Sequence, residues 1–391
     1  MSPRPLWYIV TPVYKPAPGG GAIYTDILAR ALAGEGADVV VATEAFTGEP
    51  AHERISIGRG SLTIDRIFPM RAGRAERDWR SYAAYAAQNL RMLGLPRRVA
   101  AAARQSGATS VTVLIHSSLF YNRSVLPWLM GRLRRVLPGR TRLVIDVRDP
   151  KVREHLFPIF HRSDAVVGCS RAIADSLRAT LPDTVAVVHV PIPFEPPPMP
   201  TADEIAAVLR EHNLEGTRYV LNPNGVNEQK RYPEMLELVR ELRKLAGYEQ
   251  TVLVTIGRAR DWSSRDDAAV EEGILRYVGV VPNRIALALG AGSLATVILS
   301  RIEGMPRSGL ETLAIGKPLL APDIAEFREF IPSSIVRSDA PEDMAGQIVE
   351  LSGAPSGERY PLERHQMSAL VSSYRALEAN APPANRPEGA E

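Results

Sequence analysis

Two glutamates with seven residues between them, Glu303 and Glu311, mark the segment of the chain best suited to ligand chemistry. A buried apolar run ends just before Glu303, and apolar residues at helical spacing surround Glu311. Loops at the carboxyl ends of parallel strands are where open α/β sheets bind ligands. The free N–H groups and the positive dipole end of the following helix suit a diphosphate there.

Both glutamates also have explanations that need no ligand. Ser308 followed by Glu311 is the pattern of a capping box, in which the two residues satisfy free N–H groups at the start of a helix. Glu303 is equally well explained as a solvated loop carboxylate. The spacing alone therefore leaves a binding role and a structural role open.

Three more polar residues lie at the ends of predicted strands. Lys230 follows a strand expected at residues 219–222, and a surface lysine that opens a helix is its structural alternative. His116 and Arg148 end two strands expected in the first half of the chain. A lone histidine is more often structural than catalytic, so both roles stay open for His116.

Three consecutive glycines, residues 19–21, precede a helix expected at residues 22–33. Gly20 and Gly21 allow the backbone to approach an anion closely, as in phosphate-binding turns. The Gly-x-Gly-x-x-Gly fingerprint of dinucleotide-binding domains is absent, so a flexible loop is the alternative.

Short apolar runs alternate with helical patterns, which predicts βαβ units on parallel sheets and an α/β fold. Strands are expected at residues 6–10, 38–42, 111–115, 143–147, 165–168, 185–190, 219–222, 251–256, 276–280, 295–299 and 318–321. The clearest helices are expected at residues 22–33, 171–179 and 233–246. Each polar residue named above follows or ends one of these strands.

A chain of 391 residues is longer than one hydrophobic core usually supports, so two domains are expected. Six prolines among residues 191–200 predict a stiff linker between them. We expect a first domain at residues 1–192, a linker at 193–200, a second domain at 201–363, a terminal helix at 364–380 that can pack back on the first domain, and a disordered tail at 381–391.

Composition excludes several classes of function. The net charge of +3 is too small for a nucleic-acid-binding protein. The single cysteine, Cys169, excludes an intramolecular disulfide and fits a reducing compartment, so a cytoplasmic location is expected. No apolar stretch is long enough to span a membrane. Arginine clusters such as residues 71–80 suit either peripheral contact with the inner face of an anionic membrane or a solvated surface.

The nine residues from Glu303 to Glu311, Glu-Gly-Met-Pro-Arg-Ser-Gly-Leu-Glu, resemble the Glu-x7-Glu motif of the family 4 retaining glycosyltransferases. The loop that contains Lys230 is similar to that family's Gly-Arg-Leu-x-x-Glu-Lys-Gly loop. The resemblance implies the GT-B fold, in which two doubly wound Rossmann-like domains face a cleft. It also implies transfer of a sugar from a nucleotide diphosphate with retention of configuration.

The resemblance assigns roles within a donor site. It implies that Glu303 lies at the donor sugar, Glu311 at the ribose and Lys230 at the diphosphate. The rest of the implied donor site is Gly304, Met305, Pro306 and Arg307 at the sugar, Ser308 and Leu310 at the start of the helix, Val281 at the nucleobase, and Gly20 and Gly21 facing the phosphates.

Among the positions that depart from the family pattern, two change the charges expected at the site. Gly225 stands where the family has an arginine, one of two expected phosphate cations, so Arg231 or Arg258 is a candidate to substitute for it. Arg148 stands where many members have a histidine near the reacting sugar. A clamp on the donor phosphate, a contact with the acceptor and a structural pair with Asp149 are its three alternatives.

The sequence therefore predicts a retaining, hexosyltransferase-like glycosyltransferase whose catalytic candidates are Glu303, Lys230, Arg148 and His116. Its partners are a nucleotide sugar and an acceptor, which is a polysaccharide or lipid-linked intermediate or a small natural product. No Asp-x-Asp motif is present, so no metal is expected, and no cofactor is needed beyond the donor. The alternatives are a nucleotide-sugar-binding protein without turnover and a GT-B epimerase or hydrolase of the nucleotide sugar.

Overall fold

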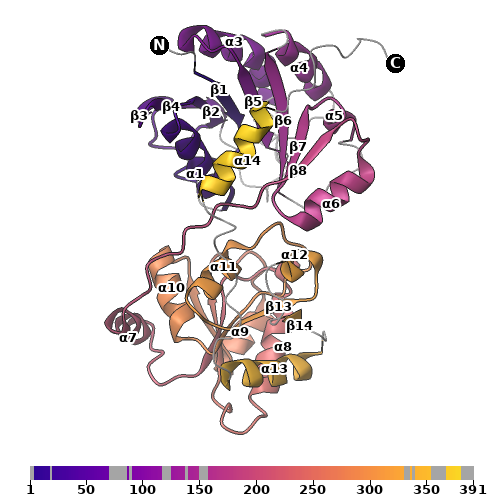
Figure 1. Cartoon of the computed structure of the whole chain (residues 1–391). Helices are drawn as coiled ribbons and strands as arrows, with labels where there is room; N and C mark the ends of the chain where they lie inside the picture. The colour runs from indigo at the N-terminus through magenta and orange to yellow at the C-terminus, as the bar shows by residue number, and fades with distance from the viewer. Residues whose placement is uncertain are drawn as a thin grey trace. The chain divides into compact units, whose positions relative to one another are not determined.

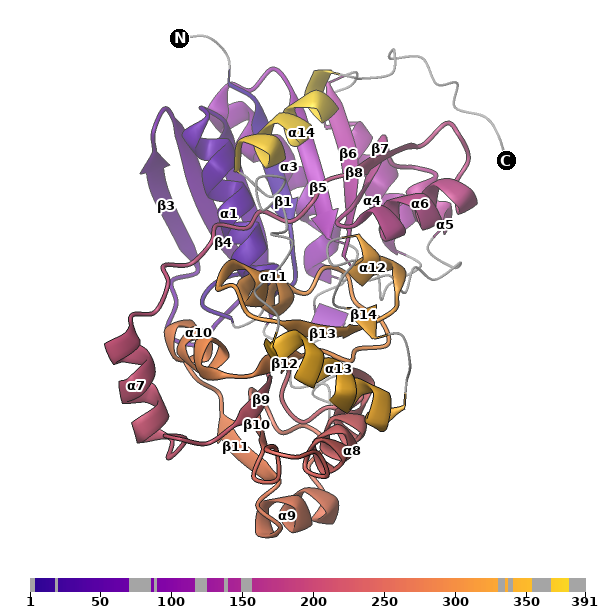
Figure 2. The ribbon, with the colours of Figure 1, turned by 60° about the horizontal axis from the view of Figure 1, so that its bottom comes forward.

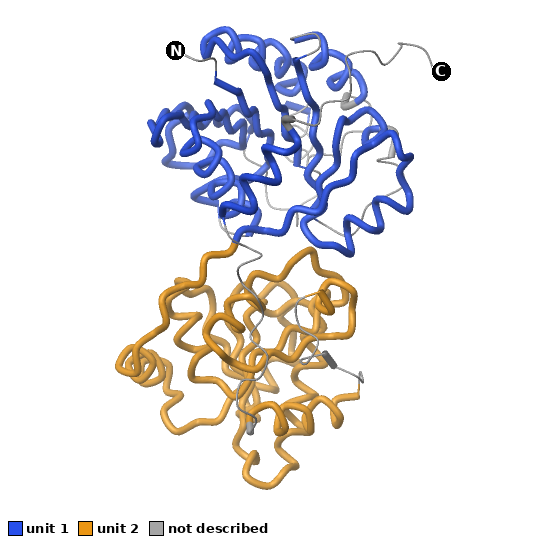
Figure 3. Tube along the Cα trace, viewed as in Figure 1, with its two compact units in different colours: residues 1–193, 365–391 blue, residues 194–364 orange. Residues whose placement is uncertain are grey.

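The computed structural model describes residues 4–17, 20–69, 86–87, 90–116, 125–136, 140–148, 157–329, 335–336, 340–353 and 367–379. The chain divides into two compact units, unit 1 with residues 1–193 and 365–391, and unit 2 with residues 194–364 (Figure 3). Each unit is built on its own sheet. Residues 191–200 form neither helix nor strand, as expected of a proline-rich segment.

Unit 1 contains an eight-stranded sheet with the order β3-β4-β2-β1-β5-β6-β7-β8 (Figure 1). Its strands are β1 (Leu6–Val10), β2 (Asp38–Glu44), β3 (His52–Ile57), β4 (Gly60–Phe68), β5 (Val111–His116), β6 (Thr141–Val147), β7 (Ala165–Gly168) and β8 (Ala186–His189). Neighbouring strands run parallel, apart from the antiparallel pair β3 and β4.

Helices cover both faces of this sheet, which is why its central strands are apolar on both sides. Along β1, Leu6, Tyr8 and Val10 pack in one core and Trp7 and Ile9 in the other. The first core contains α3 (Leu95–Ser106), α4 (Val125–Arg134), α5 (Phe157–Phe160) and α6 (Arg171–Thr180), and the second contains α1 (Gly20–Gly34) and α14 (Met367–Ala379) (Figure 2).

The terminal helix α14 belongs to unit 1, although the chain passes through unit 2 before reaching it. Tyr374 on α14 is fully buried and packs edge-on against Trp7, with the ring centroids 5.7 Å apart. Its hydroxyl lies 2.7 Å from the hydroxyl of Tyr24 on α1. Arg375 forms an ion pair with Glu35 at 3.2 Å. The helix therefore completes the core of unit 1.

Unit 2 contains a six-stranded parallel sheet with the order β11-β10-β9-β12-β13-β14. Its strands are β9 (Tyr219–Asn222), β10 (Val252–Ile256), β11 (Leu275–Gly279), β12 (Ala295–Val297), β13 (Leu319–Pro322) and β14 (Ile335–Val336). One core holds α7 (Ala202–Glu211) and α10 (Asn283–Gly292), and the other holds α8 (Tyr232–Leu242), α9 (Ser264–Glu271) and α13 (Pro341–Gly353). The short η3 (Glu228–Lys230), α11 (Arg307–Ala314) and α12 (Ala325–Arg328) follow β9, β12 and β13 respectively.

Strand order places a topological switch point in each unit. In unit 2, the first strand β9 has β10 on one side and β12 on the other. In unit 1, the first strand β1 has β2 on one side and β5 on the other. The loops after β9 and β12, and after β1 and β5, therefore leave adjacent strand ends in opposite directions. Ligands of open α/β sheets bind at this position.

All the strands predicted from sequence are present, with bounds that differ by at most two residues. The hairpin β3–β4 and the short β14 were not predicted. Strand β3 is an edge strand whose alternate residues are exposed, so its sequence lacks the continuous apolar run that identified the others.

Two predicted features lie outside the described residues, namely the arginine-rich segment 71–80 and the disordered tail 381–391. None of the helices within the described ranges is both long enough and apolar enough to cross a membrane.

Two glycines bring the loops after β9 and β10 into direct backbone contact. Gly225 has a φ of +72° and Gly257 a φ of +110°, a region that L side chains rarely adopt. A Cβ atom added at Gly225 would lie 2.2 Å from the carbonyl oxygen of Arg258. No side chain fits at this position without a shift of the backbone of Arg258.

Replacing Gly225 with alanine is expected to destabilise the protein by at least about 3 kcal/mol, because an unfavourable φ is combined with backbone overlap. Gly273 is the matched control, since it has a φ of +66° but nothing within 4 Å of an added Cβ atom. Gly273→Ala is expected to lose only about 1 kcal/mol. Urea unfolding of the two variants measures the difference, and equal losses would contradict the close backbone packing.

Candidate functional site

Lys230 and Glu303, two of the residues singled out by the sequence, meet at the switch point of unit 2. Lys230 ends η3 in the loop after β9, and Glu303 lies in the loop after β12. The Nζ atom of Lys230 donates a hydrogen bond to Oε1 of Glu303. Their side chains are 27% and 13% exposed, so water screens this attraction less than it screens a surface ion pair.

Local hydrogen bonds fix the backbone that carries Lys230. The side chain of Asn227 caps η3 by accepting a hydrogen bond from the N–H of Gln229 at 2.9 Å. The N–H of Glu228 donates to Oδ2 of Asp261 at 3.0 Å, which ties this loop to the one after β10. Lys230 therefore projects from an ordered turn and not from a free loop.

Arg231, a candidate to replace the missing phosphate arginine, has a different partner. Its backbone is left-handed, with a φ of +55°, and joins η3 to α8. Its Nε atom lies 3.2 Å from Oε1 of Glu234 in the first turn of α8, and its side chain is only 10% exposed. Arg258, the other candidate, is exposed.

The start of α11 differs from the expected capping box, which is therefore wrong. The helix begins at Arg307 with Pro306 as its cap, so Ser308 is already its second residue and its side chain caps no N–H group. The N–H groups of Gly309 and Leu310 both donate to the carbonyl of Pro306, at 3.0 and 3.3 Å. Among the described residues, the amides left free at this end are those of Arg307 and Ser308.

Glu311 joins the starts of α10 and α11. Nε of Arg307 lies 3.2 Å from Oε1 of Glu311, and Nδ2 of Asn283 lies 3.3 Å from the same oxygen. Burial raises the pKa of the Glu311 carboxyl, and Arg307 opposes that rise. The guanidinium of Arg307 lies 5.5 Å from the ring of buried Phe194. Val281 is half-buried in the loop just before Asn283.

Two residues of this site, and one residue of unit 1, carried no clear signal in the sequence. Asn283 lies beside Glu311, and Glu326 lies in α12, where burial and the nearby charge of Glu303 raise the pKa of its carboxyl. The third, in the separate network of unit 1, is Asp146, a charged residue among the five buried residues that end β6. A buried carboxylate in a strand needs a partner, so Asp146 was detectable in principle.

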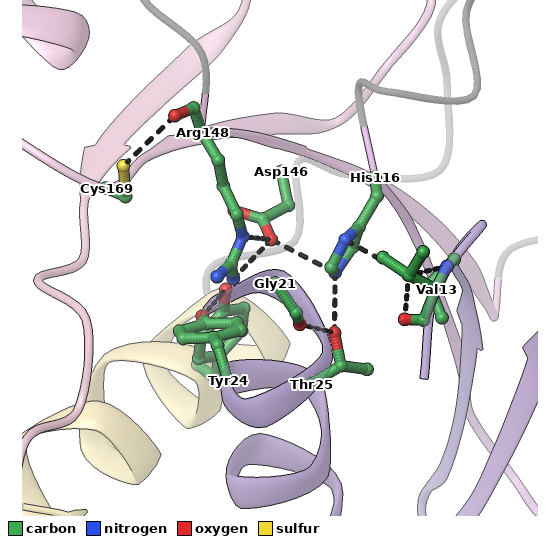
Figure 4. Close-up of polar contacts among 10 residues, drawn as sticks. Val13, Gly21, Tyr24, Thr25, His116, Asp146, Arg148 and Cys169 are labelled. Carbon is green, nitrogen blue, oxygen red and sulfur yellow. Dashed lines mark hydrogen bonds and ion pairs between the residues drawn. The ribbon is translucent and has the colours of Figure 1, made fainter. Parts of the chain in front are cut away.

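Asp146 is the centre of the polar network in unit 1 (Figure 4). Nε and Nη2 of Arg148 both donate to its Oδ2 at 2.7 Å, and Nε2 of His116 lies 3.3 Å from the same atom. The side chain of Asp146 is 1% exposed. Its Oδ1 atom is buried and has no hydrogen-bond partner in the described part of the chain. The structure thus brings His116 and Arg148 together through one carboxylate.

Arg148 is held on two sides. Its guanidinium carbon lies 3.0 Å from the ring centroid of Tyr24, whose hydroxyl meets that of Tyr374. Burial lowers the pKa of Arg148, but the carboxylate of Asp146, with smaller contributions from Tyr24, Tyr374 and Cys169, makes the net shift upward. Asp149, the partner considered from sequence, lies outside the described residues. The pairing observed for Arg148 is with Asp146.

Both ring nitrogens of His116 face polar side chains. Nδ1 lies 3.3 Å from Oγ1 of Thr11, and Nε2 lies 3.5 Å from Oγ1 of Thr25 (Figure 4). Burial lowers the pKa of His116 to about 4, with Arg148 adding to the shift and Asp146 opposing it. The imidazole is therefore neutral at pH 7.

The two glycines expected at the phosphates form the beginning of α1. Gly20 and Gly21 are the first residues of the helix, and the carbonyl of Gly21 accepts a hydrogen bond from Oγ1 of Thr25 at 2.8 Å. This contact joins the start of α1 to the network around Asp146 (Figure 4). The preceding residues 18–19 are outside the described part of the chain.

The chemistry available at the two switch points differs. Unit 2 offers a lysine, two carboxylates and free helix amides, a set that suits a ligand with both hydroxyl groups and a phosphate. Unit 1 offers a fixed guanidinium, a neutral imidazole and a buried carboxylate. Among the described residues, no group of three or more His, Cys, Asp and Glu side chains is arranged to hold a metal ion.

No model of a known protein family matches the chain, and no curated protein is detectably similar to it in sequence. Solved structures match it over almost its whole length. The trehalose 6-phosphate synthase of Burkholderia multivorans is 16% identical with a TM-score of 0.64, and the match covers 97% of this chain and 98% of that chain. The sucrose-phosphate synthase of Thermosynechococcus elongatus is 16% identical with a TM-score of 0.66, covering 96% of each chain. The Anabaena protein HepE in complex with UDP is 12% identical with a TM-score of 0.64, covering 96% and 99%.

At these identities the likeness establishes the fold. The matched proteins are glycosyltransferases of the GT-B class, and their match spans both units of this chain. The chain is therefore an α/β protein of the GT-B type, with two Rossmann-like domains, as the sequence predicted.

Proposed function

We propose that this protein is a retaining glycosyltransferase, similar to family 4, that transfers a sugar from a nucleotide diphosphate to an acceptor. The observation that carries the proposal is the contact between Lys230 and Glu303 at the switch point of unit 2, because two distant sequence motifs meet where a donor would bind. The fold neighbours add support, since they include sugar-phosphate synthases and a protein solved with UDP.

In this proposal unit 2 binds the donor. Glu303 accepts hydrogen bonds from hydroxyls of the donor sugar, and Glu311 accepts them from the ribose. Lys230 moves from Glu303 to the diphosphate, where the free amides of Arg307 and Ser308 also donate. Residues 304–306 line the sugar, and Val281 lies at the nucleobase.

The proposed reaction takes place on one face of the sugar. The acceptor oxygen forms a bond to the anomeric carbon as the bond from that carbon to the diphosphate oxygen breaks. The departing diphosphate takes the acceptor proton, so no carboxylate acts as nucleophile. Negative charge grows on the leaving diphosphate, and Lys230 together with the helix amides stabilises it more strongly in the transition state than in the ground state.

Unit 1 supplies the acceptor side in this proposal. Arg148 provides a permanent positive charge whose direction is fixed by Asp146 and by the ring of Tyr24. His116 acts as a neutral positioning residue that holds Asp146, because both of its ring nitrogens already face side chains. Because a guanidinium stays protonated at every pH near neutrality, the positive charge of Arg148 does not depend on pH there.

The test of this function is incubation of the purified protein with UDP-, GDP-, ADP- and TDP-linked hexoses, with the products resolved by chromatography. Slow donor hydrolysis, or transfer to an added acceptor, supports a glycosyltransferase. Formation of an epimer of the donor indicates an epimerase instead. Binding without any turnover indicates a nucleotide-sugar-binding protein, and absence of binding to every donor contradicts the proposal.

Lys230→Ala is expected to lower turnover by a factor of about 30 to 1,000, which corresponds to roughly 2–4 kcal/mol in the barrier. Donor affinity is expected to change much less, because the charge that Lys230 stabilises grows during bond breaking. Lys244→Ala is the matched control, since it removes an exposed lysine that pairs only with Glu241 at its surface. Near-normal turnover of Lys230→Ala would exclude a role at the leaving group.

Glu311→Gln is expected to remove the preference of the protein for a ribonucleoside diphosphate over its 2′-deoxy form. The charged hydrogen bond to the ribose hydroxyls accounts for a preference of about tenfold or more in the wild type. Calorimetric titration with both nucleotides measures this ratio. An unchanged ratio in the variant would mean that Glu311 holds Arg307 and Asn283 but does not contact ribose.

The stability of the protein is expected to fall as the pH drops from 6.5 to about 4, because the unfolded chain protonates His116 and folded unit 1 does not. The loss from this residue is on the order of 3 kcal/mol. The loss becomes negligible about one pH unit above the ordinary histidine pKa of 6.5, where the imidazole is neutral in both states. His116→Gln should flatten the stability curve over this range, measured by urea unfolding at several pH values. Equal slopes for variant and wild type would show that His116 is not buried in neutral form.

A further inference from the structure

Lys230 and Arg307, two cations of the proposed donor site, already have carboxylate partners before any ligand binds. Lys230 pairs with Glu303, and Arg307 pairs with Glu311. A nucleotide diphosphate brings a negative charge on each phosphoryl group into a partly buried site. A phosphate there needs further cations to offset its charge, since the helix end of α11 supplies only a partial positive charge.

Most other cations near the carboxyl ends of the unit 2 strands also have a carboxylate partner. The pairs are Arg231 with Glu234, Arg265 with Asp266, Arg284 with Glu204, Arg301 with Glu234, and Arg328 with Asp323. Within the described residues, the arginines of this edge that have no carboxylate partner are Arg258 and Arg260, in the loop that follows β10. Both are exposed.

The fold places this loop directly against the loop that carries Lys230. The N–H of Val226 donates to the carbonyl of Arg258, and the N–H of Arg260 donates to the carbonyl of Val226, both at 3.0 Å. These bonds make a parallel bridge between Val226 and Ala259. Arg258 and Arg260 therefore flank the bridging residue Ala259, in the segment that is bonded to the loop of Lys230.

The missing side chain of Gly225 makes this arrangement possible. An added Cβ atom would lie 2.2 Å from the carbonyl oxygen and 2.8 Å from the nitrogen of Arg258, so the two loops approach as closely as backbones can. Gly225 itself carries no side chain and therefore no positive charge. The backbone that packs against it belongs to Arg258, whose side chain is positively charged.

We infer that Arg258 and Arg260 form a cationic clamp for the diphosphate of the donor, from the loop after β10. The clamp rests on the proposed function and adds to it. The loop after β9 contributes Lys230 and, at Gly225, a position without a side chain. The loop after β10 contributes the two arginines. Arginine suits this role, since its planar guanidinium can donate two parallel hydrogen bonds to a phosphate.

The test is calorimetric titration of the full chain with UDP, GDP, ADP and TDP, and with the corresponding nucleosides. For the diphosphate that the wild type binds best, Arg258→Ala/Arg260→Ala is expected to weaken binding by about 30-fold or more. The affinity for the nucleoside is expected to stay within about threefold, because base and ribose contacts are unaffected. Arg258→Lys/Arg260→Lys should recover only part of the loss, since it keeps the charge but not the two parallel hydrogen bonds.

The matched control is Arg210→Ala/Lys244→Ala, which removes the same charge from exposed residues that pair with Glu215 and Glu241. It should bind the diphosphate like the wild type. Diphosphate affinity within twofold of wild type in Arg258→Ala/Arg260→Ala would overturn the clamp while leaving the proposed function intact. An equal loss in the control would also overturn it, by showing a long-range effect of net charge. A wild type that binds none of the diphosphates would refute the proposed function and the clamp together.

Discussion

The ion pair between Lys230 and Glu303 is the interaction on which the candidate site depends. It joins the loops after β9 and β12, which leave adjacent parallel strands at the switch point of unit 2. The pair is partly buried, so separating the two side chains is favourable only if a ligand offers each a new partner. A sugar hydroxyl and a phosphate offer those partners at the same time. The free protein thus holds the two groups close together and at low net charge.

Unit 1 also has a switch point, but the charged groups there are arranged differently. There a single buried carboxylate, Asp146, is shared by Arg148 and His116, and the ring of Tyr24 covers the guanidinium. The hydroxyl of Tyr24 meets Tyr374 on the terminal helix, so α14 helps to fix a side chain at the end of β6. This dependence gives a physical reason for the return of α14 to unit 1 after the chain has formed unit 2.

The parts of the fold that follow from the burial of apolar residues could be predicted from the sequence. Strands such as β1 and β9 are apolar on both faces, and a helix follows or precedes each of them, which identifies a doubly wound α/β chain. Strand β3 was not predicted because an exposed edge strand has no such pattern, and β4 was not predicted because Thr63, Asp65 and Arg66 interrupt its apolar residues. The contact of Lys230 with Glu303 was implied only by the positions of two motifs, since no local pattern shows which loops become neighbours.

Other details depended on backbone geometry that residue types do not specify. The Ser308–Glu311 capping box fails because α11 begins at Arg307, before Ser308 could act as its cap. Gly225 looked like a lost phosphate arginine, but its positive φ and its contact with the backbone of Arg258 show a constraint of the fold. The pairing of Arg148 with Asp146 was not predicted, because residue types do not show which of two nearby carboxylates, Asp146 or Asp149, an arginine contacts.

The most direct test of the central claim is a crystal structure of the protein with a bound nucleoside diphosphate. The account predicts the diphosphate within hydrogen-bond distance of Lys230 and of the amides at the start of α11, with the ribose hydroxyls at Glu311. Lys230 should then have left Glu303. A nucleotide bound elsewhere, with the ion pair between Lys230 and Glu303 intact, would contradict it.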